Sequence, residues 1–526
     1  ERLSRSPRFY YDSGNATQSQ LIYLCNKKGF ETHGGCMALH SLTWDHTNNT
    51  VVSNDVIVDV IRVPSDIDWD RKLHHQTSNK IQTLNTTKSQ HFVAGMSFPG
   101  LFVNQLPTEG CFSKDGKYIF LNTQWGSISI IVRITIKDGT VAPILFNLKS
   151  PNESNIPSQM ILNMNTNGDA IVSQSEPNIP TTLGIIKYDQ LVSIDVDEGK
   201  YISSQRFPML SSISASSFSN PTTIIEPRFT YHLLNVRSSN PTDGVDVPIQ
   251  GILLLPKDSN GIKNDDQKCP MIVVPHGGPH SCLSTSFVPS HAFLCNSGYA
   301  ILLANYRGST GFSQDAIEGL TGNIGRLDVE DVVLLTKTAL QIYADRSSSD
   351  NFSQIILDPN RVGICGGSHG GFLSAHCIGQ HPDLFKASAM RNPVTNIATM
   401  VTATDIPDWC HVESKTSESY NFNSFHSPSR NEMLTMWDAS PIAHVDKVVA
   451  PTLMAVGMKD KRVPPSQGIE FFHTLRSMGL KTKLLVYDDD DHAIDKVCSE
   501  ADHWVNVKRW FHKYLYLESM GRIKAS

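Results

Sequence analysis

The stretch RVGICGGSHGGF (361–372) decides the fold of the chain. It begins with a short apolar run, typical of a buried strand, and continues into two glycine pairs that enclose Ser368 and His369. Glycine loses more conformational entropy on folding than any other residue, so such a cluster needs a steric or functional reason. A tight turn between a strand and a helix supplies one.

Residues 366–370 match the G-x-S-x-G pattern of a nucleophile elbow, the strand-turn-helix that exposes the serine of α/β-hydrolases. Such a turn tolerates almost no side chain beside the serine, and it aims the Ser368 hydroxyl away from the sheet. The alternative is a glycine-rich turn of a dinucleotide-binding unit. However, the stretch lacks G-x-G-x-x-G, and no acid follows at the ribose-binding distance. We therefore predict that Ser368 is a nucleophile.

Apolar runs of strand length recur from about Phe229 onward. Strands buried on both faces have this composition, so we predict a mostly parallel sheet covered by helices. Residues 328–344 have helical periodicity with acids in the first turn, where they complement the helix dipole. The expected strands are GILLLP (251–256), MIVVP (271–275), YAILLANY (299–306), RVGICGG (361–367), KASAMR (386–391), PTLMAVG (451–457) and KTKLLVY (481–487).

A serine nucleophile needs a base, and the base needs an acid that holds its tautomer. In α/β-hydrolases the chain order is serine, acid, histidine. Asp460 follows the expected strand 451–457 and His492 follows 481–487, so both lie at carboxyl ends of strands. The acidic run 488–491 is the rival for the acid, but its members flank the base and cannot easily reach its far nitrogen. We predict the triad Ser368, Asp460 and His492.

The tetrahedral intermediate of acyl transfer needs hydrogen-bond donors for its negative oxygen. We predict the backbone N–H of His369 as one donor and the backbone N–H of Gly278, in VVPHGGPH (273–280), as the other. Zinc binding by His276 and His280 is disfavoured, because Gly-Gly-Pro between them forbids a helix that would place both on one face. We expect no metal and no cofactor.

The first 225 residues read as short strands separated by turn residues. FSKDGKYIFLNT (112–123), SISIIVRITI and NTNGDAIVSQ (165–174) each place Asp-Gly or Asn-Gly beside an apolar strand. This spacing favours propeller blades over a sandwich. We therefore predict an all-β domain over 1–225 and an α/β-hydrolase domain over 226–526, with the boundary in the Ser- and Pro-rich stretch 211–227.

The composition of the chain restricts its binding partners and the redox state of its cellular compartment. The chain has 526 residues, a formal net charge of −6 and ten cysteines without a C-x-x-C pair. This charge offers no basic surface for nucleic acid, and the apolar runs are too short to span a bilayer. We expect no nucleic-acid partner, no membrane partner and free thiols in a reducing compartment.

With these motifs the chain resembles the acylaminoacyl-peptidase branch of the prolyl oligopeptidases. The resemblance rests on HGGPHS, NYRGSTGF, GNIG, GGSHGGF, RNPV, PDWC, KDKRVP and DHA. It implies an N-terminal propeller, the same triad, and a pocket in which Arg462 binds a carbonyl of the blocked end of the substrate. It also implies release of N-acylated amino acids from short peptides, a cytoplasmic location and homo-oligomers. About 225 residues make only four or five blades, so we expect an incomplete propeller in either a fragment or an atypical member.

Two other functions stay open at this point. The same chemistry serves prolyl endopeptidases, dipeptidyl-peptidases and esterases. A binding protein with a silent hydrolase domain is the alternative outside the enzymes, although the presence of all three triad candidates argues against it.

Overall fold

The computed structural model of the chain contains two compact units. The first comprises Glu1–Pro227 with Ser284–Phe287 and Thr310–Asp315, and the second comprises the rest of the chain from Arg228. The predicted linker at 211–227 lies outside the described residues. The structure describes residues 3–10, 17–26, 35–62, 93, 96–103, 105–107, 110–147, 156–193, 202–203, 205–206, 228–239, 246–257, 268–344, 355–414 and 426–518.

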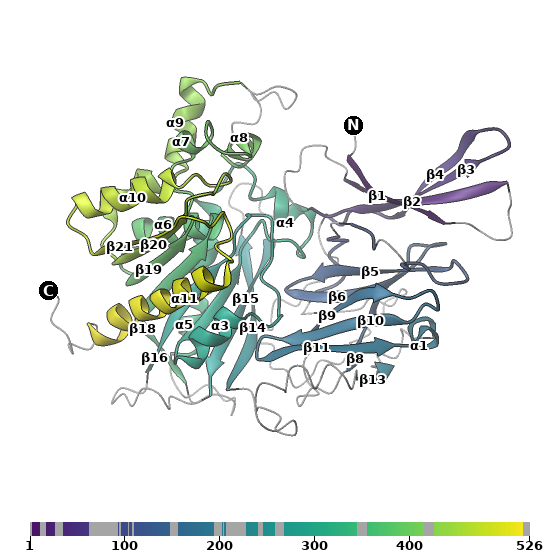
Figure 1. The fold of residues 1–526 in the computed structure, drawn as a ribbon, viewed down its shortest axis with the longest axis horizontal. Helices are drawn as coiled ribbons and strands as arrows, with labels where there is room; N and C mark the ends of the chain where they lie inside the picture. The colour runs from purple at the N-terminus through teal and green to yellow at the C-terminus, as the bar shows by residue number, and fades with distance from the viewer. Residues whose placement is uncertain are drawn as a thin grey trace. The chain divides into compact units, whose positions relative to one another are not determined.

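An eight-stranded sheet runs through the second unit in the order β14-β15-β17-β16-β18-β19-β20-β21 (Figure 1). The first three strands of this order pair antiparallel, and every later pair is parallel, which confirms the prediction of a mostly parallel sheet. All residues of β17 and β20 are buried, which explains their continuous apolar runs. The strands are β14 (Phe229–Ser239), β15 (Asp246–Pro256), β16 (Lys268–Pro275), β17 (Ala300–Asn305), β18 (Ile356–Gly367), β19 (Ala387–Arg391), β20 (Thr452–Gly457) and β21 (Thr482–Tyr487).

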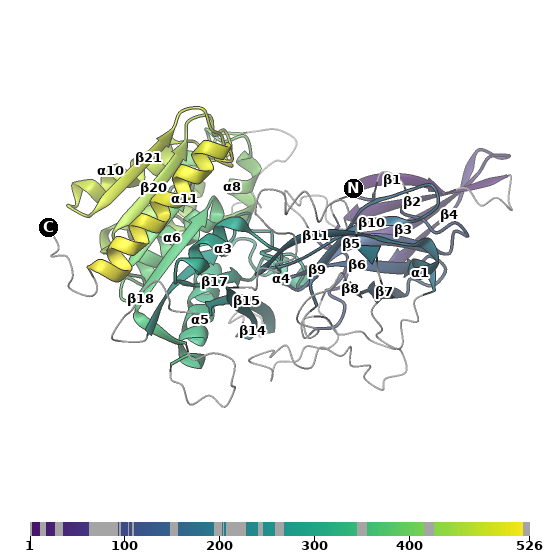
Figure 2. The same cartoon turned by 60° about the horizontal axis from the view of Figure 1, so that its bottom comes forward.

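Helices cover both faces of this sheet. Helix α11 lies on one face, and α6 and α10 lie on the other (Figures 1 and 2). The helix expected over 328–344 is α5, which begins and ends within two residues of the prediction. The helices are α3 (Pro289–Asn296), α4 (Gln314–Glu318), α5 (Leu327–Ile342), α6 (His369–Gln380), α7 (Ile397–Met400), α8 (Pro407–Glu413), α9 (Arg430–Asp438), η4 (Pro441–Lys447), α10 (Ser466–Ser477), α11 (Val497–Phe511) and η5 (His512–Leu517).

The described part of the first unit consists mainly of antiparallel sheets. One sheet has the order β1-β2-β3-β4, a second β5-β6-β7 and a third β13-β11-β10-β9. The second and third sheets share a core that includes Phe120, Ile131, Phe146 and Val172. The elements are β1 (Leu3–Tyr10), β2 (Gln18–Asn26), β3 (Ala38–Asp45), β4 (Thr50–Val58), β5 (Tyr118–Trp125), β6 (Ile128–Thr135), β7 (Val141–Ile144), β8 (Phe146–Asn147), β9 (Ser158–Met164), β10 (Ala170–Glu176), β11 (Ile179–Ile186), α1 (Tyr188–Val192), β12 (Ile202–Ser203) and β13 (Gln205–Arg206).

The turns of the first unit use the residues that the sequence singled out. Gly116 precedes β5 with a φ of 67°, and Gly139 joins β6 to β7 with a φ of 71°. Both values lie in the left-handed region, which glycine adopts without steric cost. The all-β character of this region is confirmed, and its interpretation as an incomplete propeller stays a prediction.

Among the helices of the described residues, none combines the length and the apolar character that a membrane crossing requires.

Candidate active site

Ser368 occupies the turn between β18 and α6. Its φ of 58° and ψ of −124° are unusual for a residue with a side chain. The turn is fixed on both sides, because the Ser368 N–H donates to the Arg391 carbonyl at 2.9 Å and the Phe372 N–H donates to the Ser368 carbonyl at 3.0 Å. Strained backbone of this kind persists only where its surroundings impose it, and it is concentrated at functional sites.

The glycines of this turn allow three backbone segments to approach one another. A Cβ atom on Gly366 would overlap the carbonyl oxygen of Gly370, and one on Gly370 would overlap the carbonyl oxygen of Pro275. A Cβ atom on Gly371 would come within 2.8 Å of Pro393. The glycine cluster is therefore a steric requirement of the turn itself.

Asp460 and His492 meet at the carboxyl ends of β20 and β21. The His492 Nδ1 lies 2.6 Å from the Asp460 Oδ2. The other carboxylate oxygen of Asp460 accepts the N–H groups of Arg462 at 2.8 Å and Val463 at 2.9 Å. The Asp460 side chain is fully buried, whereas that of His492 is 32% exposed. An ionised carboxylate only accepts hydrogen bonds, so this contact places a proton on Nδ1 and leaves Nε2 available as a base.

The rival acids make other contacts. Asp489 pairs with Lys459 at 2.7 Å, Asp490 accepts the Ser499 hydroxyl at 2.7 Å, and Asp491 accepts the Ala493 N–H at 3.1 Å. These bonds serve the turns around His492 and do not orient its ring.

Asn392 connects the loops of Asp460 and His492, and no sequence pattern singles it out as a site residue. It directly follows β19 with a φ of 41° and is buried. Its amide nitrogen donates to the carbonyls of Asp491 at 3.2 Å and His492 at 3.0 Å, and its amide oxygen accepts the Gly457 N–H at 2.9 Å. The only signal in the sequence was its place in RNPV, one of the motifs of the resemblance.

The Gly277–Gly278 loop after β16 lies against Ser368. A Cβ atom on Gly277 would lie 3.4 Å from the Ser368 Cβ and 3.9 Å from its Oγ. The Gly278 carbonyl accepts the indole N–H of Trp409 at 3.1 Å. Trp409 comes from α8, in the PDWC motif, and it is the second residue whose role only the structure reveals. The structure thus brings the loop of Gly278 beside Ser368.

The two histidines of this loop serve its architecture. The His276 Nε2 lies 2.7 Å from the Ser309 hydroxyl, while the Tyr306 hydroxyl donates to the His276 carbonyl at 2.9 Å. Burial lowers the pKa of His276 to about 3. His280 lies with Nδ1 2.9 Å from the Gly308 carbonyl and Nε2 3.2 Å from Glu413. Among the residues that the structure describes, no group of three or more His, Cys, Asp or Glu side chains could hold a metal ion.

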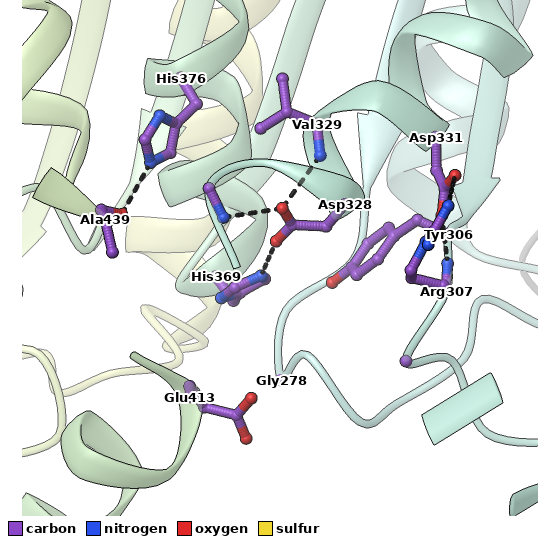
Figure 3. A network of polar contacts seen from close by, with 12 residues as sticks. Gly278, Tyr306, Arg307, Asp328, Val329, Asp331, His369, His376, Glu413 and Ala439 are labelled. Atoms are coloured by element: carbon purple, nitrogen blue, oxygen red, sulfur yellow. Dashed lines mark hydrogen bonds and ion pairs between the residues drawn. The ribbon is translucent and has the colours of Figure 1, made fainter. Parts of the chain in front are cut away.

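The side chain of His369, whose backbone N–H is a predicted oxyanion donor, is buried against Asp328. Its Nε2 lies 2.9 Å from the Asp328 Oδ2, and both side chains have no exposed surface (Figure 3). The sequence placed Asp328 among the acids that complement the dipole of α5. Of these acids, Glu330 is exposed, but Asp328 points inward to His369.

Arg462 lies next to the acid and pairs with Asp405. Its Nε lies 2.7 Å from one Asp405 carboxylate oxygen, and its Nη2 lies 3.3 Å from the other. Both side chains are nearly half exposed. The role of Arg462 in binding substrate stays a prediction.

Two family models match the chain. The model described as the prolyl oligopeptidase family matches residues 285–518. The model described as the acylamino-acid-releasing enzyme, N-terminal domain, matches residues 64–205. Together they agree with an N-terminal β domain that is followed along the chain by an α/β-hydrolase domain.

Relatives are similar over most of this chain. The acylamino-acid-releasing enzyme of Arabidopsis thaliana is 34% identical over 463 residues, which cover 86% of this chain and 55% of the relative. The enzyme of the same name from Mus musculus is 34% identical over 423 residues, which cover 80% of this chain and 52% of the relative. The chain therefore spans about half the length of these relatives.

Solved structures share the fold at low sequence identity. A puromycin-hydrolyzing peptidase of Mycobacterium tuberculosis matches with a TM-score of 0.63 and 17% identity, over 98% of this chain and 70% of the other. An acylaminoacyl peptidase of Pyrococcus horikoshii matches with a TM-score of 0.57 and 15% identity, over 97% of this chain and 82% of the other.

Proposed function

Because the chain belongs to the prolyl oligopeptidase family, we propose that it is a serine peptidase that releases an N-acylated, typically N-acetylated, amino acid from short peptides. The observation that supports this chemistry is the 2.6 Å contact between His492 and Asp460, which follow two strands of the sheet. The strained Ser368 follows another strand of the same sheet. The choice of substrate is supported by the relatives named acylamino-acid-releasing enzymes.

In the proposed mechanism, the His492 Nε2 takes the proton of the Ser368 hydroxyl as the serine oxygen attacks the carbonyl carbon of the acylated residue. The N–H groups of His369 and Gly278 stabilise the negative oxygen of the tetrahedral intermediate. His492 then protonates the leaving amine, and the C–N bond breaks to give an acyl-enzyme. Water, deprotonated by His492, attacks this ester and releases the acylated amino acid, while the proton returns to Ser368.

The side chain of Arg462 is the proposed ligand of the acyl carbonyl. A guanidinium group can donate to a neutral carbonyl while it remains paired with a carboxylate. Self-association of the chain and a cytoplasmic location complete the proposal, and both come from the resemblance alone.

The first test compares an acetyl-alanyl chromogenic substrate with its free alanyl counterpart. We expect kcat/KM to favour the acetylated compound. Preference for the free amine would indicate a dipeptidyl-peptidase or aminopeptidase pocket. Cleavage only of a substrate with an internal proline would indicate a prolyl endopeptidase, and cleavage only of an ester would indicate an esterase.

The second test replaces the nucleophile. Ser368→Ala should lower kcat by about six orders of magnitude, as in other triads that lose their serine. A fluorophosphonate probe should label the parent protein at Ser368 and leave the variant unlabelled. Substantial turnover by the purified variant would mean that another residue is the nucleophile.

A further inference from the structure

Both amides of the proposed oxyanion hole belong to residues that buried side chains hold in place. Backbone N–H groups cannot be exchanged by mutation, so their positions depend on the contacts of the rest of each residue. His369 is held through its imidazole, and Gly278 is held through its carbonyl. These two anchors come from different helices, α5 and α8.

The anchor of His369 is Asp328, in the first turn of α5. One Asp328 oxygen accepts the N–H groups of Gly325 at 2.8 Å and Val329 at 3.0 Å. The other oxygen faces the His369 Nε2 (Figure 3). The carboxylate is thereby fixed by its own helix, so it can fix the imidazole in turn.

The anchor of Gly278 is Trp409. Its indole N–H donates to the Gly278 carbonyl, and its ring meets the His369 ring edge to face, with centroids 6.0 Å apart. The His369 ring is also stacked on Phe372 at 4.7 Å. Trp409 is 2% exposed, so a single buried side chain contacts both residues of the oxyanion hole.

We infer that Asp328, acting through His369, and Trp409, acting through Gly278, are positioning residues that set the separation of the two oxyanion donors. This inference rests on the proposed serine-hydrolase chemistry of Ser368. Such donors stabilise a transition state because they are already oriented before the charge develops. A misplacement of about 1 Å can lower the rate by about 100-fold, so the anchors matter although neither touches the substrate.

Asp328→Asn tests the first anchor with an almost unchanged shape. The Asn oxygen can still accept the N–H groups of Gly325 and Val329. The NH2 group of Asn would then face the His369 Nε2–H, so that two donors meet. Otherwise the imidazole moves its proton to Nδ1, which has no hydrogen-bond partner among the described residues. We expect kcat for the acetyl-alanyl substrate to fall by about 10- to 100-fold with KM changed less than about threefold.

Trp409→Phe tests the second anchor independently. It keeps an aromatic ring beside His369 and removes only the indole donor to Gly278. Trp510→Phe is the matched control, because the Trp510 indole also donates to a backbone carbonyl, that of Pro451 at 3.4 Å. We expect Trp409→Phe to lower kcat by about 10-fold or more and Trp510→Phe to leave it unchanged.

The rate of fluorophosphonate labelling separates positioning from mere stability, since the phosphoryl oxygen of the probe occupies the oxyanion hole during attack by Ser368. We expect labelling of both anchor variants to slow by the same factor as kcat, at temperatures well below their melting points. An unlabelled parent protein would overturn the proposed function. A labelled parent with variants that react at its rate would overturn only the inference. If Asp328→Asn does not fold, Trp409→Phe decides alone.

Discussion

At the scale of single residues, the site depends on how closely backbone segments approach around Ser368. Gly370 shows this most clearly, because its Cα faces the carbonyl oxygen of Pro275 at the end of β16. Pro275 directly precedes the His276–His280 loop. A side chain at position 370 would therefore displace the Ser368 turn and the His276–His280 loop together.

Gly370→Ala should lower both stability and activity. The added methyl group meets rigid backbone, and overpacking of this kind costs about 1–3 kcal/mol of unfolding free energy. We expect kcat to fall by about 10-fold or more, because the two loops shift relative to each other. Chemical denaturation and steady-state kinetics measure the two effects.

Gly479→Ala is the control for this change. Gly479 has a φ of 79°, and a Cβ atom there would meet nothing within 4 Å. The substitution should cost about 1 kcal/mol of backbone strain and leave kcat at the parent value. Equal kinetic effects of the two variants would show that close packing at Gly370 is unimportant.

At the scale of elements, neighbouring parallel strands bring residues from distant parts of the sequence to one edge of the sheet. The elbow ends β18, Asn392 follows β19, Asp460 follows β20 and His492 follows β21, and these four strands are adjacent. Asn392 adds cross-links between the loops, which strand pairing alone does not supply. The geometry of Asp460 and His492 therefore depends on a third, buried residue that links their loops.

Asn392→Ala should loosen the His492 loop. The change leaves the Gly457 N–H and the carbonyls of Asp491 and His492 without this partner, at a cost of about 1–3 kcal/mol for each buried group left unsatisfied. We expect kcat to fall by about 10-fold or more while KM changes little, because buried Asn392 acts through the two loops that it connects. Parent kinetics in a variant with reduced stability would restrict Asn392 to a structural role.

At the scale of the whole molecule, the hydrolase unit buries several histidines in their neutral form. Burial lowers the pKa of His276, His376 and His503 to about 3 and that of His291 to about 4, from an ordinary value of 6.5. The neighbours of His376 also suit a neutral ring. The Gln380 amide nitrogen lies 2.9 Å from Nδ1 and can donate to it, and Nε2 lies 3.1 Å from the Ala439 carbonyl and can donate to that oxygen. Above about pH 4, these histidines therefore take up protons when the unit unfolds.

The free energy of unfolding should therefore fall as the pH falls below about 6.5. The pKa of each of these histidines is lower in the folded state than in the unfolded state, so the unfolded state binds more protons. Their contribution to the free energy of unfolding is therefore complete above pH 6.5 and is lost as the pH falls towards 3. Each such histidine contributes a slope of about 1.4 kcal/mol per pH unit in this window. Denaturation curves between pH 7 and pH 5 measure the slope.

The variant His376→Gln assigns part of this slope. It should reduce the pH dependence by about one proton relative to the parent. An unchanged slope in His376→Gln would mean that His376 is already protonated in the folded protein or does not become protonated on unfolding.

Much of this architecture could be predicted from the sequence, because local patterns encode it. The elbow glycines, the fully buried strands and the Asp-Gly turns each follow from a short-range steric or burial requirement. Asp460 and His492 could be selected because a catalytic chain order and the ends of strands restrict the candidates. Asp328 shows the limit of such reasoning. It shares its helical face with Asp331, Val332 and Leu335, and this spacing is typical of a buried face, whereas the helix dipole favours an acid in the first turn whether it is buried or exposed.

The sequence by itself determined the class of the sheet and the turn that presents Ser368, and it singled out Ser368, Asp460 and His492 as the triad that we propose. Only the tertiary structure decided which buried groups hold them, namely Asn392 between two loops, Trp409 on Gly278 and Asp328 on His369. The physical reason is the separation along the sequence of the residues that specify each feature. A turn or a strand is specified by neighbours along the chain, whereas a hydrogen bond between residues 41 or 131 positions apart exists only after the sheet and its helices have packed.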